Sequence, residues 1–144
     1  MNNFTETVLG TEIITRVKLS YGRALLKGDL IDRFYDIFLV SHPEIKPKFS
    51  KTNFEQQKGL LKHGINLMIS YAGKSSTGMS GLTRIQQSHS IGRMNIEPKF
   101  YTYWGNSLLK AISEFDPEFS DSLKEDWRKV LRVGIEFIIS GYKK

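Results

Sequence analysis

The sequence predicts an all-α fold, and three observations support this expectation. The chain contains only four prolines, which leave long stretches without a helix breaker. In those stretches apolar residues recur every three or four positions, as on one face of a helix, without a convincing two-residue alternation. The 144 residues, 40% of them hydrophobic and 25% charged, are typical of a single globular domain. We therefore expect one domain over residues 1–144, with about six or seven helices around one core.

The first part of the chain predicts two helices and a corner. Helices are expected over Thr11–Leu26 and from about Asp29 to Val40. The predicted inner face of the second helix consists of Leu30, Ile31, Phe34, Tyr35 and Phe38. We expect His42 to end this helix, because a residue that precedes a proline is pushed out of the helical conformation. The segment His42–Phe49, with two prolines, then predicts a tight irregular turn.

The middle of the chain predicts a long helix followed by a loop. Thr52 and Glu55 have the three-residue spacing of a capping box, so a helix should begin there and end near Ala72. Its predicted inner face consists of Gln57, Leu61, Gly64, Ile65, Met68 and Tyr71. The segment Gly73–Gly81 contains three of the twelve glycines and several serines, which predicts a flexible loop.

Three further helices are expected in the last part of the chain. A short one, from Leu82 to about Gly92, carries His89. A longer one over Lys99–Phe115 directs Tyr101, Trp104, Leu108, Leu109 and Ile112 inward. The last is expected over Ser122–Tyr142, where the first residue and Glu125 have the spacing of a second capping box. Its predicted inner face consists of Trp127, Val130, Leu131, Gly134, Phe137 and Ile138.

Composition excludes several kinds of chemistry. The chain has no cysteine, which rules out disulfides, thiolate metal sites and iron–sulfur clusters. It has only three histidines (His42, His63 and His89), so a site built from several histidines would need nearly all of them. The 21 Lys and Arg against 15 Asp and Glu give a net charge of +6, but the basic residues are scattered. We interpret this charge as an aid to solubility and expect no nucleic-acid partner.

Targeting and membrane signals are absent from the pattern. The N-terminal segment Met1–Leu9 contains Glu6 and lacks a basic start followed by an apolar stretch, so it predicts no secretory signal. Apolar runs are only a few residues long, which is too short for a membrane-spanning helix. We expect a cytoplasmic protein without a membrane partner.

Two residues are the main candidates for a functional site. His89 is either an axial ligand to iron, since a haem needs only one strong protein ligand, or a surface histidine among polar neighbours. Tyr35 lies on a predicted inner face, where its hydroxyl needs a partner that is either a pocket ligand or a backbone carbonyl or water. Gln57 starts an otherwise apolar face and either points into a polar cavity or lies at its rim. Gln56 would take that place if the helix were rotated.

The remaining candidates receive structural interpretations. We expect His63 to be exposed and His42 to be structural or exposed. Asp116 and Glu118 lie near a proline turn and are interpreted as helix-end charges. The aromatic cluster at residues 101–104 has helical spacing and is interpreted as core. No GxGxxG, P-loop, HExxH, GxSxG or EF-hand motif occurs.

Two segments carry a resemblance to a known family. Phe34-Tyr35-Asp36, followed by His42-Pro43-Glu44 and Phe49, is similar to the distal tyrosine, proline corner and haem-packing phenylalanine of bacterial haemoglobins. His89, followed by residues 94–98 (Met-Asn-Ile-Glu-Pro) and then Tyr101 and Trp104, resembles the proximal-histidine segment of sensor globins. Tyr35 and His89 lie 54 residues apart. The chain therefore resembles, over nearly its whole length, bacterial single-domain globins close to the haem domains of globin-coupled sensors.

The resemblance implies a globin fold and haem b (iron protoporphyrin IX) as the cofactor. It implies His89 as the proximal iron ligand at a pentacoordinate iron, Tyr35 as the distal hydrogen-bond donor, and Gln57 or Gln56 as a second distal residue. The other haem-pocket residues that it implies are Phe49, Leu61, Ile96 and Tyr101, with Arg93, Lys51 or Lys58 pairing with a propionate.

Elementary chemistry agrees with these roles. The second ring nitrogen of a ligating His89 needs an acceptor, for which the carbonyl of Ile85 or Gln86 and the hydroxyl of Ser88 are candidates. A hydrogen bond from Tyr35 to iron-held dioxygen is worth about 1.5–3 kcal/mol, since its acceptor carries charge. Such a bond slows the release of oxygen roughly ten- to a hundredfold.

Three functional hypotheses follow. The first is a haem protein, not an enzyme, that reversibly binds dioxygen, nitric oxide or carbon monoxide for oxygen transport, storage or gas sensing, as a monomer or homodimer. The second is a nitric oxide dioxygenase, which would need an external reductase, just as sensing would need a signalling partner. The third is a haem-free helical interaction module, in which His89 and Tyr35 only pack or lie at the surface.

Overall fold

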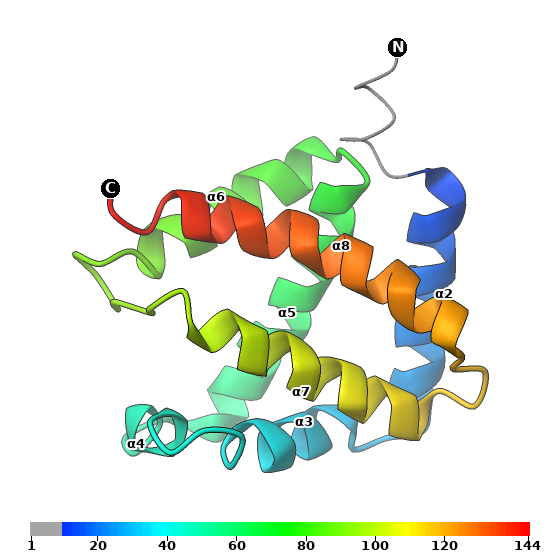
Figure 1. Cartoon of the computed structure of the whole chain (residues 1–144), viewed down its shortest axis with the longest axis horizontal. Helices are drawn as coiled ribbons and strands as arrows, with labels where there is room; N and C mark the ends of the chain where they lie inside the picture. The colour runs from blue at the N-terminus through cyan, green and yellow to red at the C-terminus, as the bar shows by residue number, and fades with distance from the viewer. Residues whose placement is uncertain (1–9) are drawn as a thin grey trace.

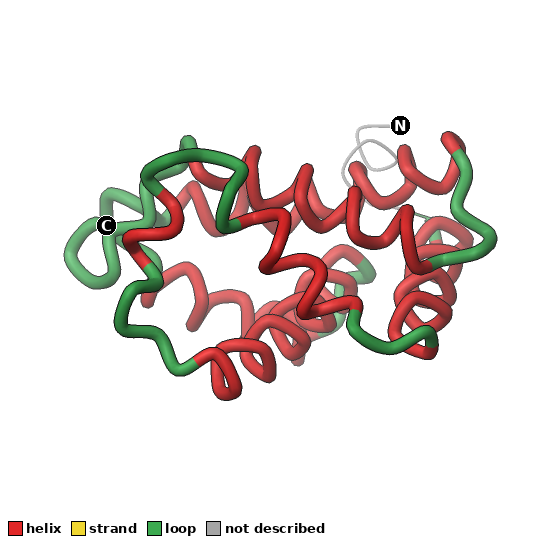
Figure 2. Tube along the Cα trace, turned by 90° about the horizontal axis from the view of Figure 1, so that it is seen from below, coloured by secondary structure: helices red, strands yellow, loops and turns green. Residues whose placement is uncertain are grey.

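The computed structural model describes residues 10–144, and within that range every regular element is an α-helix, as the sequence predicts (Figure 2). The described helices are α2 (Thr11–Leu26), α3 (Leu30–Phe38), α4 (Ile45–Lys48), α5 (Phe54–Ala72), α6 (Ser76–Ser88), α7 (Phe100–Phe115) and α8 (Asp121–Ser140). The segment Met1–Leu9, where we expect no secretory signal, lies outside the described residues. None of the helices between residues 10 and 144 combines the length and the apolar character that crossing a bilayer requires.

The helices pack on one another in a crossed arrangement (Figure 1). Helix α5 packs against α6 and α8, while α3 packs against α7 and α2 packs against α8. In Figure 1, α8 runs beside α6, and α7 lies between α8 and the pair α3 and α4. Helices α6 and α7 are not among the closely packed pairs. Residues 89–99 connect these two helices.

The apolar faces that the sequence predicts form the core. All five residues of the predicted inner face of α3 are buried. Phe34 from α3 lies edge-on to Trp104 of α7, with 6.0 Å between the ring centroids. Trp127 of α8 is fully buried and donates its indole N–H to the Ser20 hydroxyl of α2 at 2.9 Å. An aromatic contact thus joins α3 to α7, and a buried hydrogen bond joins α2 to α8.

Asp116 is a buried hub, not merely the helix-end charge that the sequence suggests. Its carboxylate accepts two hydrogen bonds from Arg23, at 2.7 and 3.0 Å, and one from Ser20 at 2.6 Å. It also accepts the backbone N–H of Glu118 at 2.9 Å. Burial alone would raise the pKa of Asp116, but the hydrogen bonds from Arg23 and Ser20 outweigh it and hold the pKa below its usual range. Asp116 thereby fixes the end of α7 to α2.

The flexible loop predicted over Gly73–Gly81 is wrong, because most of it belongs to α6. Ser75 caps this helix by accepting the backbone N–H of Gly78 at 3.2 Å. A Cβ at Gly78 would lie 2.5 Å from the backbone nitrogen of Tyr71, and one at Gly81 would lie 2.5 Å from the Leu67 side chain. These glycines therefore permit close packing of α6 on α5, and they do not mark a turn. The helix predicted to begin at Leu82 actually begins at Ser76 and ends at Ser88.

Both predicted capping boxes are displaced in the structure. Helix α5 is capped by Asn53, whose side chain accepts the backbone N–H of Gln56, and Thr52 plays no such part. Helix α8 is capped by Ser120, which accepts the N–H of Leu123, in place of Ser122. Asparagine is as good a cap as serine or threonine, so the presence of several such residues in a row leaves the start uncertain by a residue or two.

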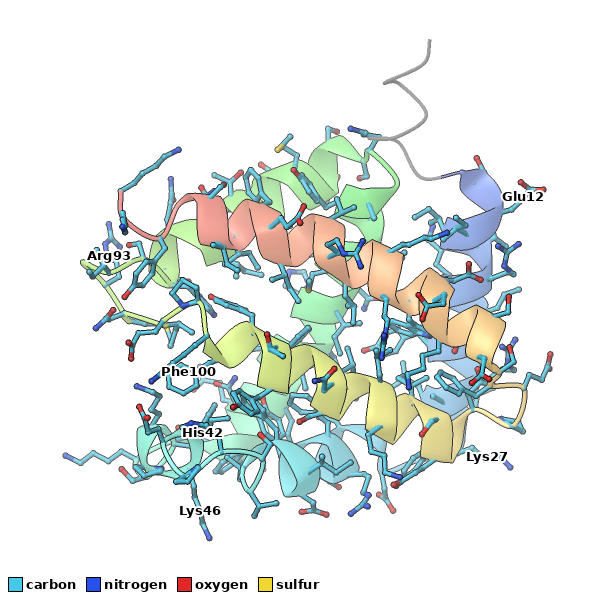
Figure 3. All side chains as sticks on the ribbon, viewed as in Figure 1. Glu12, Lys27, His42, Lys46, Arg93 and Phe100 are labelled. Carbon is cyan, nitrogen blue, oxygen red and sulfur yellow. The ribbon has the colours of Figure 1, made fainter. Side chains whose placement is uncertain are left out.

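The proline corner is more regular than expected. Helix α3 already ends at Phe38, so His42 does not end it, and the segment predicted as an irregular turn contains the single turn of α4. The His42 ring accepts the backbone N–H of Glu44 at 3.0 Å and lies edge-on to Phe100 and Tyr103. Figure 3 shows His42 facing Phe100 across the corner. The structural interpretation of His42 is therefore confirmed.

Candidate functional site

Tyr35 is buried on the inner face of α3, with only 4% of its surface exposed. Its hydroxyl accepts a hydrogen bond from the side-chain amide of Gln57 at 3.1 Å. Burial raises the pKa of Tyr35, and the bond from Gln57 partly opposes that shift, so the hydroxyl keeps its proton at neutral pH. Within the described residues the hydroxyl proton has no acceptor. Tyr35 therefore offers a hydrogen-bond donor inside the molecule.

The structure distinguishes the two neighbouring glutamines. Gln57 is half-buried and contacts Tyr35, whereas Gln56 is exposed. The cap at Asn53 fixes this phase, because it places Phe54 at the first position of α5 and Gln57 one turn later, on the same face. Leu61 follows one further turn along and is buried. Gln57 is thus the residue that shares a face with Leu61.

Two phenylalanines line the other side of Tyr35. Phe49, at the end of α4, and Phe54, at the start of α5, both lie edge-on to the Tyr35 ring, with centroids 6.1 and 5.4 Å away. The two phenylalanine rings stack on each other at 5.9 Å. The sequence analysis did not identify Phe54, because it placed the cap of α5 at Thr52 and not at Asn53 and so left the direction of Phe54 undetermined. Its spacing of three residues from Gln57 is the signal that could have identified it.

His89 lies at the C-terminal end of α6, where it caps the helix and is half-buried. Ser88 Oγ donates to the carbonyl of Ile85 at 3.0 Å and lies 3.0 Å from His89 Nδ1. All three groups are satisfied in the tautomer in which Nδ1 carries the ring proton and donates it to Ser88 Oγ, while the hydroxyl donates to the Ile85 carbonyl. The Nε2 atom then carries a lone pair, and it has no partner within the described residues.

Burial also sets the protonation state of His89. It lowers the pKa of the ring, and a hydrogen bond to the backbone of Ile85 offsets only part of that shift. The imidazole is therefore neutral at pH 7, which is the form that ligates metals. Ser88 and Ile85, both among the acceptors that the sequence suggests, orient the ring.

A tightly bonded loop follows His89. The backbone N–H of Ile96 donates to the carbonyl of His89 at 3.1 Å, and that of Met94 donates to the carbonyl of Ser88 at 3.1 Å. Ile96 is half-buried, whereas Arg93 is exposed at the tip of the loop (Figure 3). The loop is closed by Asn95 in a left-handed conformation, with φ of 54°. The backbone of His89 is thus bonded to α6 on its N-terminal side and to the loop on its C-terminal side.

Tyr101, in the first turn of α7, is half-buried. Burial raises its pKa strongly, and the neighbouring Tyr142 phenol adds to the shift. Tyr142 in turn donates its hydroxyl to the Asn95 side chain, and its carbonyl accepts the N–H of Ile91 at 2.7 Å. Tyr101 therefore lies near Tyr142, whose hydrogen bonds tie the end of α8 to the loop after His89.

The predicted site residues form two groups. Tyr35, Gln57 and Phe49 contact one another directly or through the Tyr35 ring, with Leu61 on the same helix face as Gln57. His89, Ile96 and the exposed Arg93 belong to the loop between α6 and α7. No hydrogen bond or aromatic contact between described residues joins the two groups.

The remaining candidate residues lie outside these two groups. His63 is exposed, as expected, and Lys58 forms an ion pair with Asp32. Among residues 10–144 no three His, Asp or Glu side chains gather in a way that could hold a metal ion. A metal ion at His89 would therefore have one imidazole as its only ligand among these described side chains.

Comparison with known proteins gives three concordant matches. The family model described as Globin matches residues 32–138. A flavohemoprotein from Oceanobacillus iheyensis is 31% identical over 140 residues, which cover 93% of this chain and 33% of that protein. This chain therefore spans about a third of the length of that relative.

The structural match covers both chains almost completely. A crystal structure from Pseudomonas aeruginosa PAO1, described as structurally highly homologous to a human hemoglobin, superposes with a TM-score of 0.88. It is 36% identical to this chain and the match covers 92% of this chain and 99% of the other. This match confirms the expected all-helical globin fold.

Proposed function

The chain belongs to the globin family, and on that premise we propose that it holds a haem and reversibly binds dioxygen and other diatomic gases. The observation that carries the proposal is the presence in one fold of two side chains suited to a haem. One is a neutral, oriented imidazole at His89, and the other is the buried hydroxyl of Tyr35 held by Gln57. Each is of the chemical type that one face of a haem iron requires.

The residues present fit a haem b. In the tautomer with the ring proton on Nδ1, which lies 3.0 Å from Ser88 Oγ, the Nε2 atom of the neutral His89 is available to ligate iron. Around the two groups lie apolar side chains that would pack on a porphyrin: Phe49, Leu61, Ile96 and Tyr101. The Tyr35 hydroxyl is a second indication of a bound ligand, because its proton has no acceptor among the described residues. A buried donor without an acceptor costs about 1–3 kcal/mol of stability.

When bound, a haem supplies an iron with a coordination position open to a gas. The role of Tyr35 is then to donate a hydrogen bond to a polar ligand, and Gln57 keeps the tyrosine oxygen aligned by donating to it. Burial around Tyr35 excludes competing water, which strengthens that bond. Carbon monoxide, which is less polar than dioxygen when held by iron, gains less from it.

The two propionate groups of a haem would form ion pairs with exposed cationic side chains. Arg93 is exposed at the tip of the loop that follows His89, and Lys51 is exposed two residues after Phe49. We propose these two as partners of the propionates. Lys58 is the weaker candidate because it pairs with Asp32.

Addition of haemin to the purified protein tests the proposal. We expect a Soret band that saturates at about one haemin per chain and, after reduction, shifts when carbon monoxide is added. A band that grows without saturation, or that does not respond to carbon monoxide, would indicate nonspecific haemin adsorption and overturn the proposal.

A second candidate function is favoured by the similarity to a flavohemoprotein. In that case nitric oxide, dioxygen and one electron would combine to give nitrate, and a flavin-containing reductase would supply the electron. Stopped-flow mixing of the oxygenated protein with nitric oxide, in the presence of a reductase and NADH, distinguishes the two functions. Repeated turnover supports the dioxygenase, and a single oxidation without re-reduction supports gas binding.

A further inference from the structure

A pocket of about 440 Å³ lies at the proline corner, between the end of α3, helix α4 and the start of α5. Its lining is mostly apolar and includes Leu39, Pro43, Pro47, Phe49 and Phe54. The prolines have no N–H to offer a polar occupant. Lys46 belongs to the same lining and, in Figure 3, extends away from the molecule at the corner. The pocket therefore suits a small apolar molecule.

Two rings contact both this pocket and the Tyr35 ring. Phe49 and Phe54 line the pocket and also lie edge-on to the Tyr35 ring. On its other side, the Tyr35 hydroxyl accepts the bond from Gln57. The stacked pair of phenylalanines is thus a shared wall, with the pocket on one side and the buried hydroxyl on the other.

Both residues of this wall lie at helix ends and not in helix interiors. Phe49 follows the four-residue helix α4, and Phe54 is the first residue of α5. Both side chains are half-buried, so neither ring is enclosed on all sides.

We propose that the corner pocket takes up an apolar diatomic gas and passes it between Phe49 and Phe54 to the Tyr35 site. This inference rests on the proposed function, since it supplies a route to the same site. Dioxygen, nitric oxide and carbon monoxide share the required chemistry: they are small, uncharged and weakly hydrated. A charged molecule would lose its hydration in a pocket with so few polar partners.

Filling the pocket tests the route. Ser50 lines the pocket and is exposed, so Ser50→Trp can fill it without a direct change at Tyr35. The matched control is Asn66→Trp, which fills a second pocket of about 260 Å³ between α2 and α5. In the haem-loaded protein, we expect Ser50→Trp to slow the bimolecular rebinding of carbon monoxide after flash photolysis about fivefold or more. Asn66→Trp should leave that rate unchanged.

A second variant acts in the opposite direction. Phe54→Ala removes half of the wall, so it should speed rebinding while Ser50→Trp slows it. Equal rebinding rates in wild type, Ser50→Trp and Phe54→Ala would overturn the route and leave the haem function intact. A wild-type protein without a carbon monoxide-sensitive Soret band would instead overturn the proposed function, and the route with it.

Xenon gives a readout that does not depend on haem. Under xenon pressure we expect the methyl resonances of Leu39, which lines the pocket, to shift in wild type and in Asn66→Trp but not in Ser50→Trp. Leu39 resonances that stay unshifted in wild type would show that the pocket takes up no apolar gas, and would overturn the proposal.

Discussion

The hydroxyl of Tyr35 distinguishes this site most clearly at the scale of single residues. Its burial and the bond from Gln57 keep it protonated and aligned, with a proton to give. We predict that Tyr35→Phe speeds the dissociation of oxygen at least about tenfold, because it removes a hydrogen bond worth about 1.5–3 kcal/mol. Stopped-flow displacement of oxygen by carbon monoxide measures this rate.

A tyrosine elsewhere provides the control for that measurement. Tyr71→Phe, in α5, removes a hydroxyl from a ring that packs on Phe137, and it should leave oxygen dissociation unchanged. An equal effect of both substitutions would mean that Tyr35 acts through general stability and donates no bond to the ligand.

Sequence patterns predicted the inner residues well but not the rotation of every helix. Tyr35 was predicted on a buried face because all its apolar neighbours share one helical period, and the structure confirms its burial. Gln56 and Gln57 could not be separated, since Thr52 and Asn53 are both good caps and shift the phase of α5 by one residue. Only the formed helix shows which amide reaches Tyr35.

At the scale of elements, helix α6 shows why a glycine-rich segment was mistaken for a loop. Composition alone reports the conformational freedom of Gly78 and Gly81, but it does not report which surface lies against them. The structure places the backbone of Tyr71 and the side chain of Leu67 there. The absence of a side chain is therefore required by packing between α5 and α6 and not by a turn.

This account of α6 predicts opposite effects of alanine at two helical glycines. Gly78→Ala should destabilise the protein by about 1–3 kcal/mol, because its Cβ would lie 2.5 Å from the Tyr71 backbone nitrogen. Gly59→Ala, in an exposed part of α5 with nothing within 4 Å, should stabilise it by about 0.5–1 kcal/mol. Urea unfolding measures both. Similar effects of the two substitutions would contradict close packing at Gly78.

At the scale of the whole molecule, Asp116 links α7 to α2 through a buried set of hydrogen bonds. Its pKa is lowered in the folded state, so its contribution to stability is present above the unfolded pKa of about 4 and is lost as the pH falls through the folded value. We predict that Asp116→Asn costs about 3 kcal/mol at pH 7, because the substitution removes the buried carboxylate that Arg23 and Ser20 bond and leaves Arg23 only the exposed Glu118, 3.7 Å away.

The pH dependence gives that prediction a distinctive form. The difference in unfolding free energy between wild type and Asp116→Asn should shrink as the pH is lowered from 5 to below the folded pKa of the carboxyl. A difference that stays constant over this range would show that the carboxylate charge contributes nothing. Sequence reasoning missed this hub because Ser20, Arg23 and Asp116 are brought together only by the packing of α2 against α7.

The central claim is that His89 holds a haem iron, and its most direct test is the haemin titration of His89→Ala beside His63→Ala. His63 is exposed on α5 and serves as the matched control. The account predicts a saturating Soret band in wild type and in His63→Ala, and a loss of that band in His89→Ala. If His89→Ala binds haemin with the same spectrum and affinity as wild type, His89 is not the iron ligand and the central claim is wrong.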